Sequence, residues 1–321
     1  MNCINMISII VPIYNVSNYL VDCLQSIKMQ LYQDFEVLCV DDGSTDDSAD
    51  IVRRFAADDI RFKLYHQPNS GVSVARNLGI KHSQGEFICF VDADDMLAPN
   101  YLSVLYKFCK EGYFAVCSYT RDYTQLGKEQ KKCTKYDAYT FISNIINESI
   151  KHPNLWAMMF KADVIKTNSI EFYPGCVRNE DTEFYMKYLV HERGSIIVSD
   201  YRGYFYRDNP NSAMHLTRQN AFSSFEASKR IETYLAGKGI IMDYNKMLYR
   251  SIQAYSVRLA REKNIELYEK LHELYNVRHV METLIKSNRL FRHVVSAIYI
   301  ILGKNLFYKL FSLMGYKRQN S

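Results

Sequence analysis

Several signatures are missing from this 321-residue sequence, and each absence removes a class of protein. No GxGxxG follows the first apolar run, which disfavours a dinucleotide-binding Rossmann domain, and no GxxxxGK[ST] occurs that could hold phosphates as a P-loop. The eight cysteines form no CxxC pair, and two of them, Cys39 and Cys89, lie inside apolar runs. We interpret them as small buried side chains in a reducing compartment, not as a zinc site or a disulfide set.

Long hydrophobic runs are also scarce. The N-terminus has no cationic stretch followed by an extended apolar core, so we expect no signal peptide. Near the C-terminus the longest uncharged run covers residues 294–303, far below the ~20 residues that a spanning helix needs. A processive polysaccharide synthase would carry such spans and a QxxRW motif, but the only tryptophan, Trp156, is not part of one. That class is therefore disfavoured.

Charge is unevenly distributed along the chain. Residues 1–215 hold 22 lysines and arginines against 27 aspartates and glutamates, whereas residues 216–321 hold 18 against 8. Seven basic residues and no acidic one follow Glu282, interleaved with apolar side chains at helical spacing. We predict a basic helical C-terminal region at 216–321. Its residues 283–321 either contact an anionic membrane surface or pack on the rest of the chain with solvated lysines.

The first hundred residues alternate between apolar runs of strand length and helical patterns. This alternation predicts right-handed crossovers and a Rossmann-like α/β fold, with a mostly parallel central sheet flanked by helices. Such sheets bind nucleotide-sized ligands at the carboxyl ends of their strands. Strands are expected at 7–11 (ended by Pro12), 35–40, 62–65, 87–91 and 113–117; helices are expected at 17–30, around 51–55 and at 72–81; a polar loop is expected at 120–135.

Candidate ligand groups follow three of these strands, at residues 12–15, 41–44 and 92–95. The topology places all three on one edge of the sheet. The acids Asp92, Asp94 and Asp95 repel one another unless a cation lies among them. Mg²⁺ or Mn²⁺, held by one or two of these carboxylates and sharing its other positions with phosphate oxygens and water, would meet that need. The open alternative is an acidic turn that caps the helix beginning near Pro99.

Five motifs occur in order along the chain: VPIYN at 11–15, VDDGSTD at 40–46, NSGVSVARN at 69–77, VDADD at 91–95 with its DxD-like acids, and NEDTEF at 179–184. In this order they resemble the motifs of the family 2 inverting glycosyltransferases, which have the nucleotide-diphospho-sugar transferase (GT-A type) fold. The resemblance covers about residues 7–215. It implies a catalytic domain at 1–215, with a nucleotide-binding half at 1–119 and an acceptor half at 120–215, before the helical region at 216–321.

On the donor side, the resemblance implies a role for each matching residue. Pro12 and Tyr14 would line the nucleobase pocket next to Asn15, and Asp42 would bond the uracil edge. Arg76 would contact the nucleotide. Two alternatives stay open, because Asp42 could simply cap the following helix, and Arg76 could be a surface helix residue that pairs with an acid. Asp92 would bind the ribose or the metal, and Asp94 would bind the metal that bridges the diphosphate. Ala93, between them, would belong to the same donor-binding turn.

On the acceptor side, Asp181 is the candidate general base, since an inverting transfer needs a carboxylate to take the proton of the attacking hydroxyl. Glu180 would lie beside the acceptor, and both acids could instead only favour a helix start. Trp156 could face the sugar or belong to the core. The resemblance also implies a closing pair of strands at 196–198 and 201–207. The loop that follows this pair would contact the diphosphate through Arg207, Ser212 or His215.

The sequence thus predicts a metal-dependent inverting glycosyltransferase. It would move one hexose or N-acetylhexosamine from a UDP-sugar to a saccharide acceptor. The resemblance points to capsule or lipopolysaccharide O-antigen assembly on a polyprenyl-diphosphate lipid, in the cytoplasm at the inner membrane face. A homodimer is an option, and no nucleic acid partner is expected. Open alternatives are a catalytically inactive nucleotide-sugar-binding or scaffolding module and, with less support, a nucleotidyltransferase of the same fold type.

Overall fold

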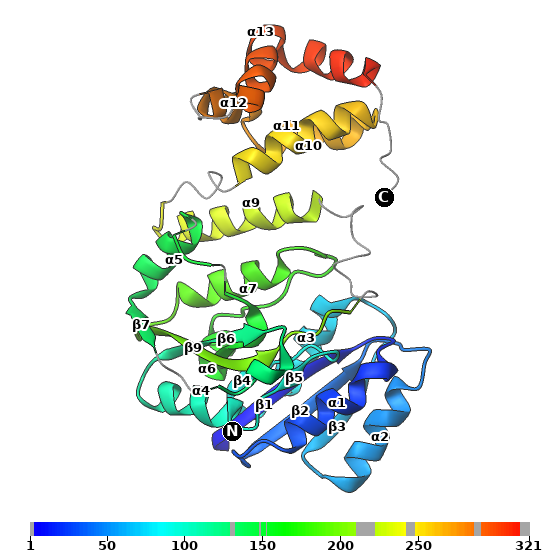
Figure 1. The fold of residues 1–321 in the computed structure, drawn as a ribbon, viewed down its shortest axis with the longest axis vertical. Coiled ribbons are helices and arrows are strands. Elements are labelled where there is room, and N and C mark those ends of the chain that lie inside the picture. The colour runs from blue at the N-terminus through cyan, green and yellow to red at the C-terminus, as the bar shows by residue number, and fades with distance from the viewer. Residues whose placement is uncertain are drawn as a thin grey trace. The chain divides into compact units, whose positions relative to one another are not determined.

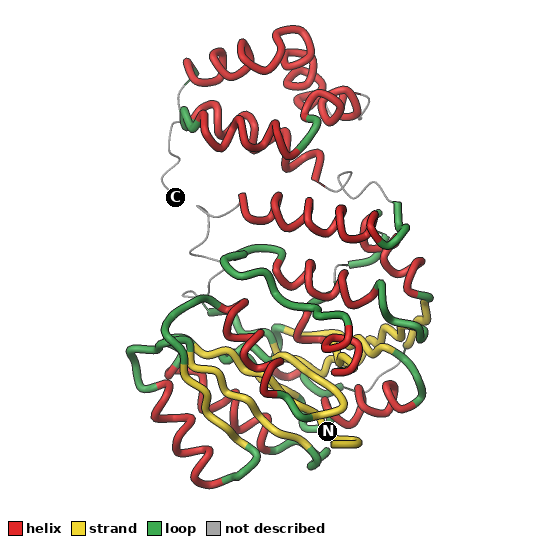
Figure 2. The backbone as a smooth tube through the Cα atoms, turned by 180° about the vertical axis from the view of Figure 1, so that it is seen from behind, coloured by secondary structure: helices red, strands yellow, loops and turns green. Residues whose placement is uncertain are grey.

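The computed structural model describes residues 3–128, 132–147, 149–151, 153–209, 222–241, 248–285 and 290–314. The chain divides into two compact units, one of Met1–Ile145 with Ser149–Asn220 and one of Ile146–Glu148 with Ala221–Ser321. The first unit carries a nine-stranded sheet. In the second unit the described residues form helices and loops (Figure 2). The boundary predicted after residue 215 falls outside the described residues.

Four parallel strands form the first half of the sheet, in the order β3-β2-β1-β4. Their connecting helices include α1 and α2, which lie side by side over these strands (Figure 1). Every residue of β2 is buried, as a strand covered on both faces requires. The free thiols of Cys39 and Cys89 are buried in this sheet. The elements are β1 (Cys3–Ile13), α1 (Ser17–Lys28), β2 (Phe35–Asp41), α2 (Ser48–Asp58), β3 (Phe62–His66), α3 (Val72–His82) and β4 (Gly85–Phe90).

Strand β1 does not end at Pro12 as predicted but continues to Ile13. Its pairing with β4 ends at Ile10, whose carbonyl accepts a hydrogen bond from Val91, whereas Pro12 pairs with β2. Residues two apart along a strand direct their backbone groups to the same side. The missing N–H of Pro12 therefore faces the region beyond the end of β4, where no ladder bond needs a donor.

The second half of the sheet mixes directions. β8 is antiparallel to both β4 and β6, and β6 is parallel to β9. The pair of strands predicted at 196–198 and 201–207 is one continuous strand, β9, because β7 pairs with it through Ser199 and the amide of Asp200 donates to the carbonyl of Lys132. The strands are β5 (Met96–Leu97), β6 (Phe114–Thr120), β7 (Cys133–Tyr136), β8 (Met158–Lys161) and β9 (Ile196–Phe205).

The residues predicted as a polar loop at 120–135 include the 3₁₀ turn η1 and most of β7, so part of this stretch is ordered against the sheet. Within the described residues, four α-helices complete the unit, and its core joins the faces of β1, β2 and β4 to α1 and α4. The predicted α/β fold class is confirmed. The elements are α4 (Tyr101–Lys110), η1 (Tyr123–Gln125), α5 (Ala138–Ile146), η2 (Leu155–Ala157), α6 (Ala162–Thr167) and α7 (Glu180–Leu189).

The C-terminal unit has its own aromatic and aliphatic core, to which α9 to α13 all contribute. Two buried hydrogen bonds tie these helices together: Gln253 Nε2 donates to Ser296 Oγ at 2.8 Å, and Tyr275 Oη donates to the Phe225 carbonyl at 2.7 Å. The helices are α9 (Phe222–Gly237), α10 (Tyr249–Arg261), α11 (Ile265–Leu274), α12 (Val277–Ile285) and α13 (Leu290–Leu313).

Helix α13 corrects one expectation from the sequence. Its residues Val294–Leu313 are long and apolar enough to cross a membrane by length and composition, with a mean hydropathy of 1.4. The length of the longest uncharged run underestimates how apolar this helix is. Lys304 and Lys309 interrupt the run, but they do not make the helix polar overall. The helix is nevertheless broken at Gly303, where φ is 70° and ψ is 173°, and Figure 1 shows it bent.

Candidate active site

The candidate site is organised around the guanidinium of Arg76 in α3. This side chain is buried, and its two terminal nitrogens contact carboxylates from two distant motifs. Nη2 lies 3.0 Å from Asp92 Oδ1, and Nη1 lies 2.7 Å from Asp181 Oδ1 and 3.3 Å from Glu180 Oε1. The structure therefore brings the predicted donor-side acid and both predicted acceptor-side acids to one cation.

Glu180 and Asp181 reach this position because they form the first turn of α7. The preceding residue, Asn179, has the left-handed conformation at φ 65°, which asparagine tolerates better than most residues. Acidic side chains in a first turn interact favourably with the positive end of the helix dipole. The local sequence thus favours a helix start here, and the same start directs both carboxylates to Arg76.

Two of the carboxyls that contact Arg76, those of Glu180 and Asp92, hold protons more tightly than ordinary carboxyls because their pKa values are raised. Burial, followed by the charge of Asp181, raises the pKa of Glu180 to about 8, although Arg76 opposes the rise. Burial also raises the pKa of Asp92 to about 6, with Arg76 opposing it and the charges of Asp181 and Asp94 adding to it. One guanidinium does not offset all of this negative charge. Perturbed carboxyls of this kind are typical of functional sites.

Asp42 holds the loop that leads into α3. Its Oδ1 accepts hydrogen bonds from Gln67 Nε2 at 2.7 Å and from the Ser70 amide at 2.8 Å, and its Oδ2 accepts one from the Gly71 amide at 2.8 Å. Ser70 and Gly71 directly precede α3, so Asp42 fixes the start of the helix that carries Arg76. The helix that it supports is α3 and not the immediately following α2. Its role on the uracil edge stays a prediction.

The other strand-end residues of the donor side lie at the same edge. Asn15 ties the ends of β1 and β2 together, because its Oδ1 accepts from the Thr45 amide at 2.8 Å and its own amide donates to Ser44 Oγ at 3.1 Å. Gly43 permits this close turn, since a Cβ there would lie 2.8 Å from the Asn69 nitrogen. Tyr14 is half exposed, as a nucleobase contact requires, and Pro12 is partly buried.

The third acid of the 92–95 cluster, Asp95, has a structural task that sequence reasoning missed. It is buried, and its carboxylate accepts hydrogen bonds from Tyr204 Oη and from the Arg207 amide, both at 2.8 Å. The Asp92 amide donates to the same Tyr204 Oη at 3.1 Å. Asp95 therefore anchors the end of β9 to the turn that carries Asp92 and Asp94.

Residues after β9 also reach Asp94. Arg207 Nε donates to the Asp94 carbonyl at 2.9 Å, and Asn209 Nδ2 donates to Asp94 Oδ2 at 2.8 Å. The terminal nitrogen of Arg207 lies 3.0 Å from Asp22 Oδ2. Arg207 thus lies beside the acid cluster, and its contact with the diphosphate stays a prediction. Ser212 and His215 lie outside the described residues.

Trp156 is buried in the core cluster of the first unit. Its ring stacks on that of Tyr204 with the centroids 4.1 Å apart, and Tyr119 meets it edge-on at 5.1 Å. The Trp156 carbonyl accepts a hydrogen bond from Tyr101 Oη at 2.7 Å. These contacts favour the core alternative, in which Trp156 supports Tyr204 and, through it, Asp95.

The predicted metal ligands can be judged by their chemistry. Asp92 uses Oδ1 for Arg76 and Asp94 uses Oδ2 for Asn209, so each has a second carboxylate oxygen that could bind a cation. Across the described ranges, no group of three or more His, Cys, Asp or Glu side chains is arranged to hold a metal ion. Two carboxylates, with phosphate oxygens and water in the other positions, suit Mg²⁺ or Mn²⁺. The residues present therefore fit such a cation.

Comparison with known proteins identifies the family. The sequence model of glycosyl transferase family 2 matches residues 8–168, half of the chain. The chain belongs to this family. The match contains the predicted donor-side motifs and Trp156, but it ends before Glu180 and Asp181.

Relatives in this family share only part of their length with the chain. Glycosyltransferase GlyG from Streptococcus pneumoniae is 44% identical over 107 residues, which are 33% of this chain and 36% of GlyG. Glycosyltransferase GlyA from the same species is 46% identical over 101 residues, which are 32% of this chain and 14% of GlyA. The chain thus matches about a third or less of the length of these relatives.

A solved structure extends the likeness to the whole chain. Residues 1–349 of S. aureus TarS, in complex with UDP-GlcNAc, superpose with a TM-score of 0.71 over 97% of this chain and 93% of that one, at 22% identity. This likeness confirms the predicted GT-A type fold. It includes the helical C-terminal region, which the family match does not cover.

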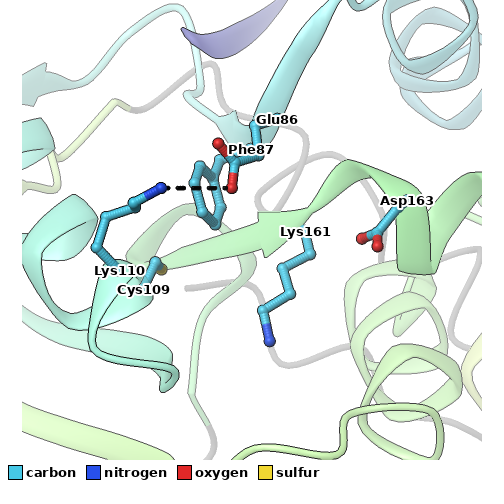
Figure 3. A pocket seen from close by; sticks show the side chains of 6 residues that line it. All are labelled: Glu86, Phe87, Cys109, Lys110, Lys161 and Asp163. Carbon is cyan, nitrogen blue, oxygen red and sulfur yellow. Dashed lines mark ion pairs between the residues drawn. The ribbon is translucent and has the colours of Figure 1, made fainter. Parts of the chain in front are cut away.

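A cavity of about 390 Å³ lies at the amino end of β4, whereas the candidate active site lies at its carboxyl end. Figure 3 shows the six side chains around it: Glu86, Phe87, Cys109, Lys110, Lys161 and Asp163. Lys110 lies 3.9 Å from Glu86, and Lys161 lies 3.0 Å from the buried Glu192. Its lysines and acids largely compensate one another, so the lining does not select a ligand by charge.

Proposed function

We propose that this family 2 member is a metal-dependent inverting glycosyltransferase that moves one hexose or N-acetylhexosamine from a UDP-sugar to a saccharide acceptor. The observation that carries this proposal is the contact of a single buried guanidinium, Arg76, with Asp92 of the donor motif and with Glu180 and Asp181 of the acceptor motif. A direct displacement requires the donor site and the proton acceptor to lie close together, and a shared contact with Arg76 brings the two motifs together.

On the donor side, Asp92 and Asp94 would hold Mg²⁺ or Mn²⁺. When bound, the cation would offset the charge that develops on the departing nucleoside diphosphate. Asp94 is oriented through Asn209, and the backbone at Asp94 is held by Arg207. Pro12, Tyr14 and Asn15, with the loop held by Asp42, would receive the nucleoside. A uridine donor is supported by the UDP-GlcNAc bound to TarS, a protein of the same fold.

On the acceptor side, Asp181 would take the proton of the acceptor hydroxyl as that oxygen attacks the anomeric carbon opposite the leaving group. The carbon–oxygen bond to the acceptor forms while the bond to the diphosphate breaks, so the configuration inverts and an α-linked donor gives a β-linked product. Arg76 holds one oxygen of Asp181 at 2.7 Å and thereby orients the carboxylate. Glu180, as its neighbour, would lie beside the acceptor.

The acceptor and the cellular setting are proposals by analogy with the family. The acceptor would be a saccharide on a polyprenyl-diphosphate lipid, as in the assembly of capsule or of lipopolysaccharide O-antigen. The enzyme would work in the cytoplasm, at the inner face of the cell membrane, with residues 283–321 near the anionic surface. A homodimer remains a further prediction.

The test is release of UDP from a panel of UDP-hexoses and UDP-N-acetylhexosamines without acceptor, with Mn²⁺ or Mg²⁺ and again with EDTA. We expect slow, metal-dependent hydrolysis of one donor, which would establish the nucleotide and the sugar together. Release of pyrophosphate instead would indicate nucleotidyl transfer. No hydrolysis, combined with no UDP binding in the presence of metal, would sink the proposal.

The metal role is tested separately by Asp94→Asn. We expect a loss of about tenfold or more in metal-dependent donor affinity, because a neutral amide is a much weaker ligand for a hard cation. The matched control is Asp22→Asn, since Asp22 is a half-exposed acid that pairs with Arg207 but is no proposed ligand. Unchanged donor affinity and unchanged metal dependence in Asp94→Asn would reject the ligand assignment.

A further inference from the structure

Helix α13 presents different residues to its own unit and to the outside. Val295 and Tyr299 before the break at Gly303, and Phe307 and Phe311 after it, are buried in the core of the C-terminal unit. Side chains at these four-residue spacings lie on one face of each helical segment. They pack against α10 and α12, so one face of α13 is already occupied within the unit.

The other face is exposed and apolar. After the break, four exposed apolar side chains follow the spacing i, i+4, i+7 and i+8, which places them on one stripe. Ile301 before the break is 79% exposed and Leu313 near the end is 85% exposed, and what is informative is that such side chains gather on one helix. We call this set the α13 stripe; it consists of Val294, Ile301, Leu306, Leu310, Leu313 and Met314.

The break at Gly303 argues against a single membrane-spanning helix. Residues 290–302 and 304–313 would be about 20 Å and 15 Å long at the rise of an α-helix, each shorter than the ~30 Å hydrocarbon core. The Lys304 carbonyl also accepts a hydrogen bond from Tyr268 Oη at 3.1 Å, and the Lys304 ammonium pairs with Glu269. These contacts hold the broken helix on its own unit and leave the stripe exposed.

Charge indicates what the stripe contacts. After Glu282 the sequence has seven basic residues and no acidic one, so the apolar stripe belongs to a cationic segment. Lys309 is exposed within the second half of α13, between stripe residues Leu306 and Leu310. An apolar face bordered by lysines and arginines binds an anionic bilayer surface through both burial and charge.

We propose that the α13 stripe lies in the plane of an anionic membrane, with its apolar side chains in the headgroup and acyl boundary and Lys309 near the lipid phosphates. The biological reason for this contact rests on the proposed function, since the enzyme would meet a lipid-linked acceptor at such a surface. It adds to that function a defined set of contact residues and a helix that lies on the membrane without crossing it.

The test is co-sedimentation of the full chain with vesicles of phosphatidylcholine alone and of phosphatidylcholine with phosphatidylglycerol, at low and at high salt. The stripe variant combines Ile301→Ser, Leu306→Ser and Leu310→Ser. The matched control replaces three exposed apolar residues elsewhere, Leu31→Ser, Ile60→Ser and Ile241→Ser, which are 69%, 90% and 88% exposed. Far-UV circular dichroism establishes that each variant is folded.

We expect binding to the anionic vesicles that weakens at high salt, a loss of about tenfold or more in the stripe variant, and little change in the control. Lys309→Glu should lower binding by at least about fivefold. Three results would overturn the inference: no vesicle binding by the parent, full binding by the stripe variant, or an equal loss in the control. A concentration-dependent dimer that the stripe variant abolishes, without vesicle binding, would assign the stripe to a second copy instead.

Hydrolysis of the UDP-sugar in solution separates this inference from the proposed function. If vesicle binding fails while metal-dependent hydrolysis is retained, only the membrane inference is lost. If hydrolysis is absent in all proteins while stripe-dependent vesicle binding is present, only the proposed function is lost.

Discussion

Strand β4 has a cluster of charged side chains at each of its two ends, and the clusters differ in how their charges are compensated. At the amino end, the cavity is lined by Lys110 and Lys161 together with Glu86 and Asp163 (Figure 3). Each lysine has an acidic neighbour, Glu86 at 3.9 Å for Lys110 and Glu192 at 3.0 Å for Lys161. Positive and negative groups there are close to balance.

At the carboxyl end, negative charge is in excess. Arg76 alone contacts three carboxyl groups, and Asp94 and Asp95 lie beside one of them. Burial and the neighbouring charges of Asp92 and Asp94 raise the pKa of Asp95 to about 8. The balanced end has no excess charge to attract a ligand, whereas the ionised acids Asp92, Asp94 and Asp181 at the other end would suit the divalent cation proposed above.

The largest expected effect concerns the general base. Asp181→Asn keeps the size of the side chain but cannot accept a proton, so we expect a loss of about 10³-fold in transfer rate, with UDP-sugar binding retained. Turnover is measured with acceptor, and donor affinity by titration calorimetry. Undiminished turnover would contradict the assignment of Asp181 as general base. The carboxyl end of β4 would then have no demonstrated catalytic group to distinguish it from the amino end.

The next largest effect is expected from removing the positive charge of Arg76, which lies at the carboxyl end of β4. Arg76→Met leaves three carboxyl groups around a buried site without their shared partner, and we expect a loss of about 3–5 kcal/mol in the free energy of unfolding. The matched control at the amino end is Lys110→Met, where the pair is wide and partly solvated, with an expected change of less than about 0.5 kcal/mol. Chemical denaturation measures both, and equal losses would show that the two ends do not differ as described.

A smaller effect is expected at Asp95. Asp95→Leu removes the acceptor of Tyr204 Oη and of the Arg207 amide, and we expect a loss of about 1–3 kcal/mol in the free energy of unfolding. Because the pKa of Asp95 is raised to about 8, its carboxyl is largely protonated at neutral pH, and an amide imitates that state. Asp95→Asn should therefore be close to the parent protein. A loss as large as that of Asp95→Leu would show that Asp95 is charged in the folded protein.

The remaining effect is a change of stability with pH. The pKa of Glu180 is raised from 4.5 to about 8, so between these values the folded protein binds a proton that the unfolded chain releases. Rising pH in this window therefore destabilises the parent, and Glu180→Gln removes that contribution. We expect the Tm of the variant, relative to the parent, to rise from pH 5 to pH 8. A constant Tm difference across this range would show that the carboxyl is not perturbed.

Much of the fold could be predicted from local sequence. The alternation of strands and helices over β1 to β4 and the helical character of the C-terminal region follow from periodicity, which short stretches of chain contain by themselves. Errors arose where a partner strand decided the outcome. Pro12 is accepted in β1 because β4 has already ended, and β9 is continuous because β7 pairs across the expected gap.

The candidate site was predictable residue by residue but not as an arrangement. The acids at 92–95 and at 180–181 were identified from motifs, and Arg76 was assigned to the nucleotide. Its partners Glu180 and Asp181 are 104 and 105 residues away in sequence, and no local pattern specifies such a contact. Asp95 was grouped with its neighbours as one more acid, although the side chains that bond it come from the distant strand β9 and the residues after it.

By itself, the sequence determined the family, the order of most elements and the residue types at each strand end, because these depend on neighbours along the chain. Only the tertiary structure decided that Arg76 joins both motifs, that Asp95 is a buried anchor and that α13 turns one apolar stripe outward. Each of those outcomes depends on which surfaces pack together. Packing removes water from some polar and apolar groups and leaves others exposed, a selection that is made in three dimensions.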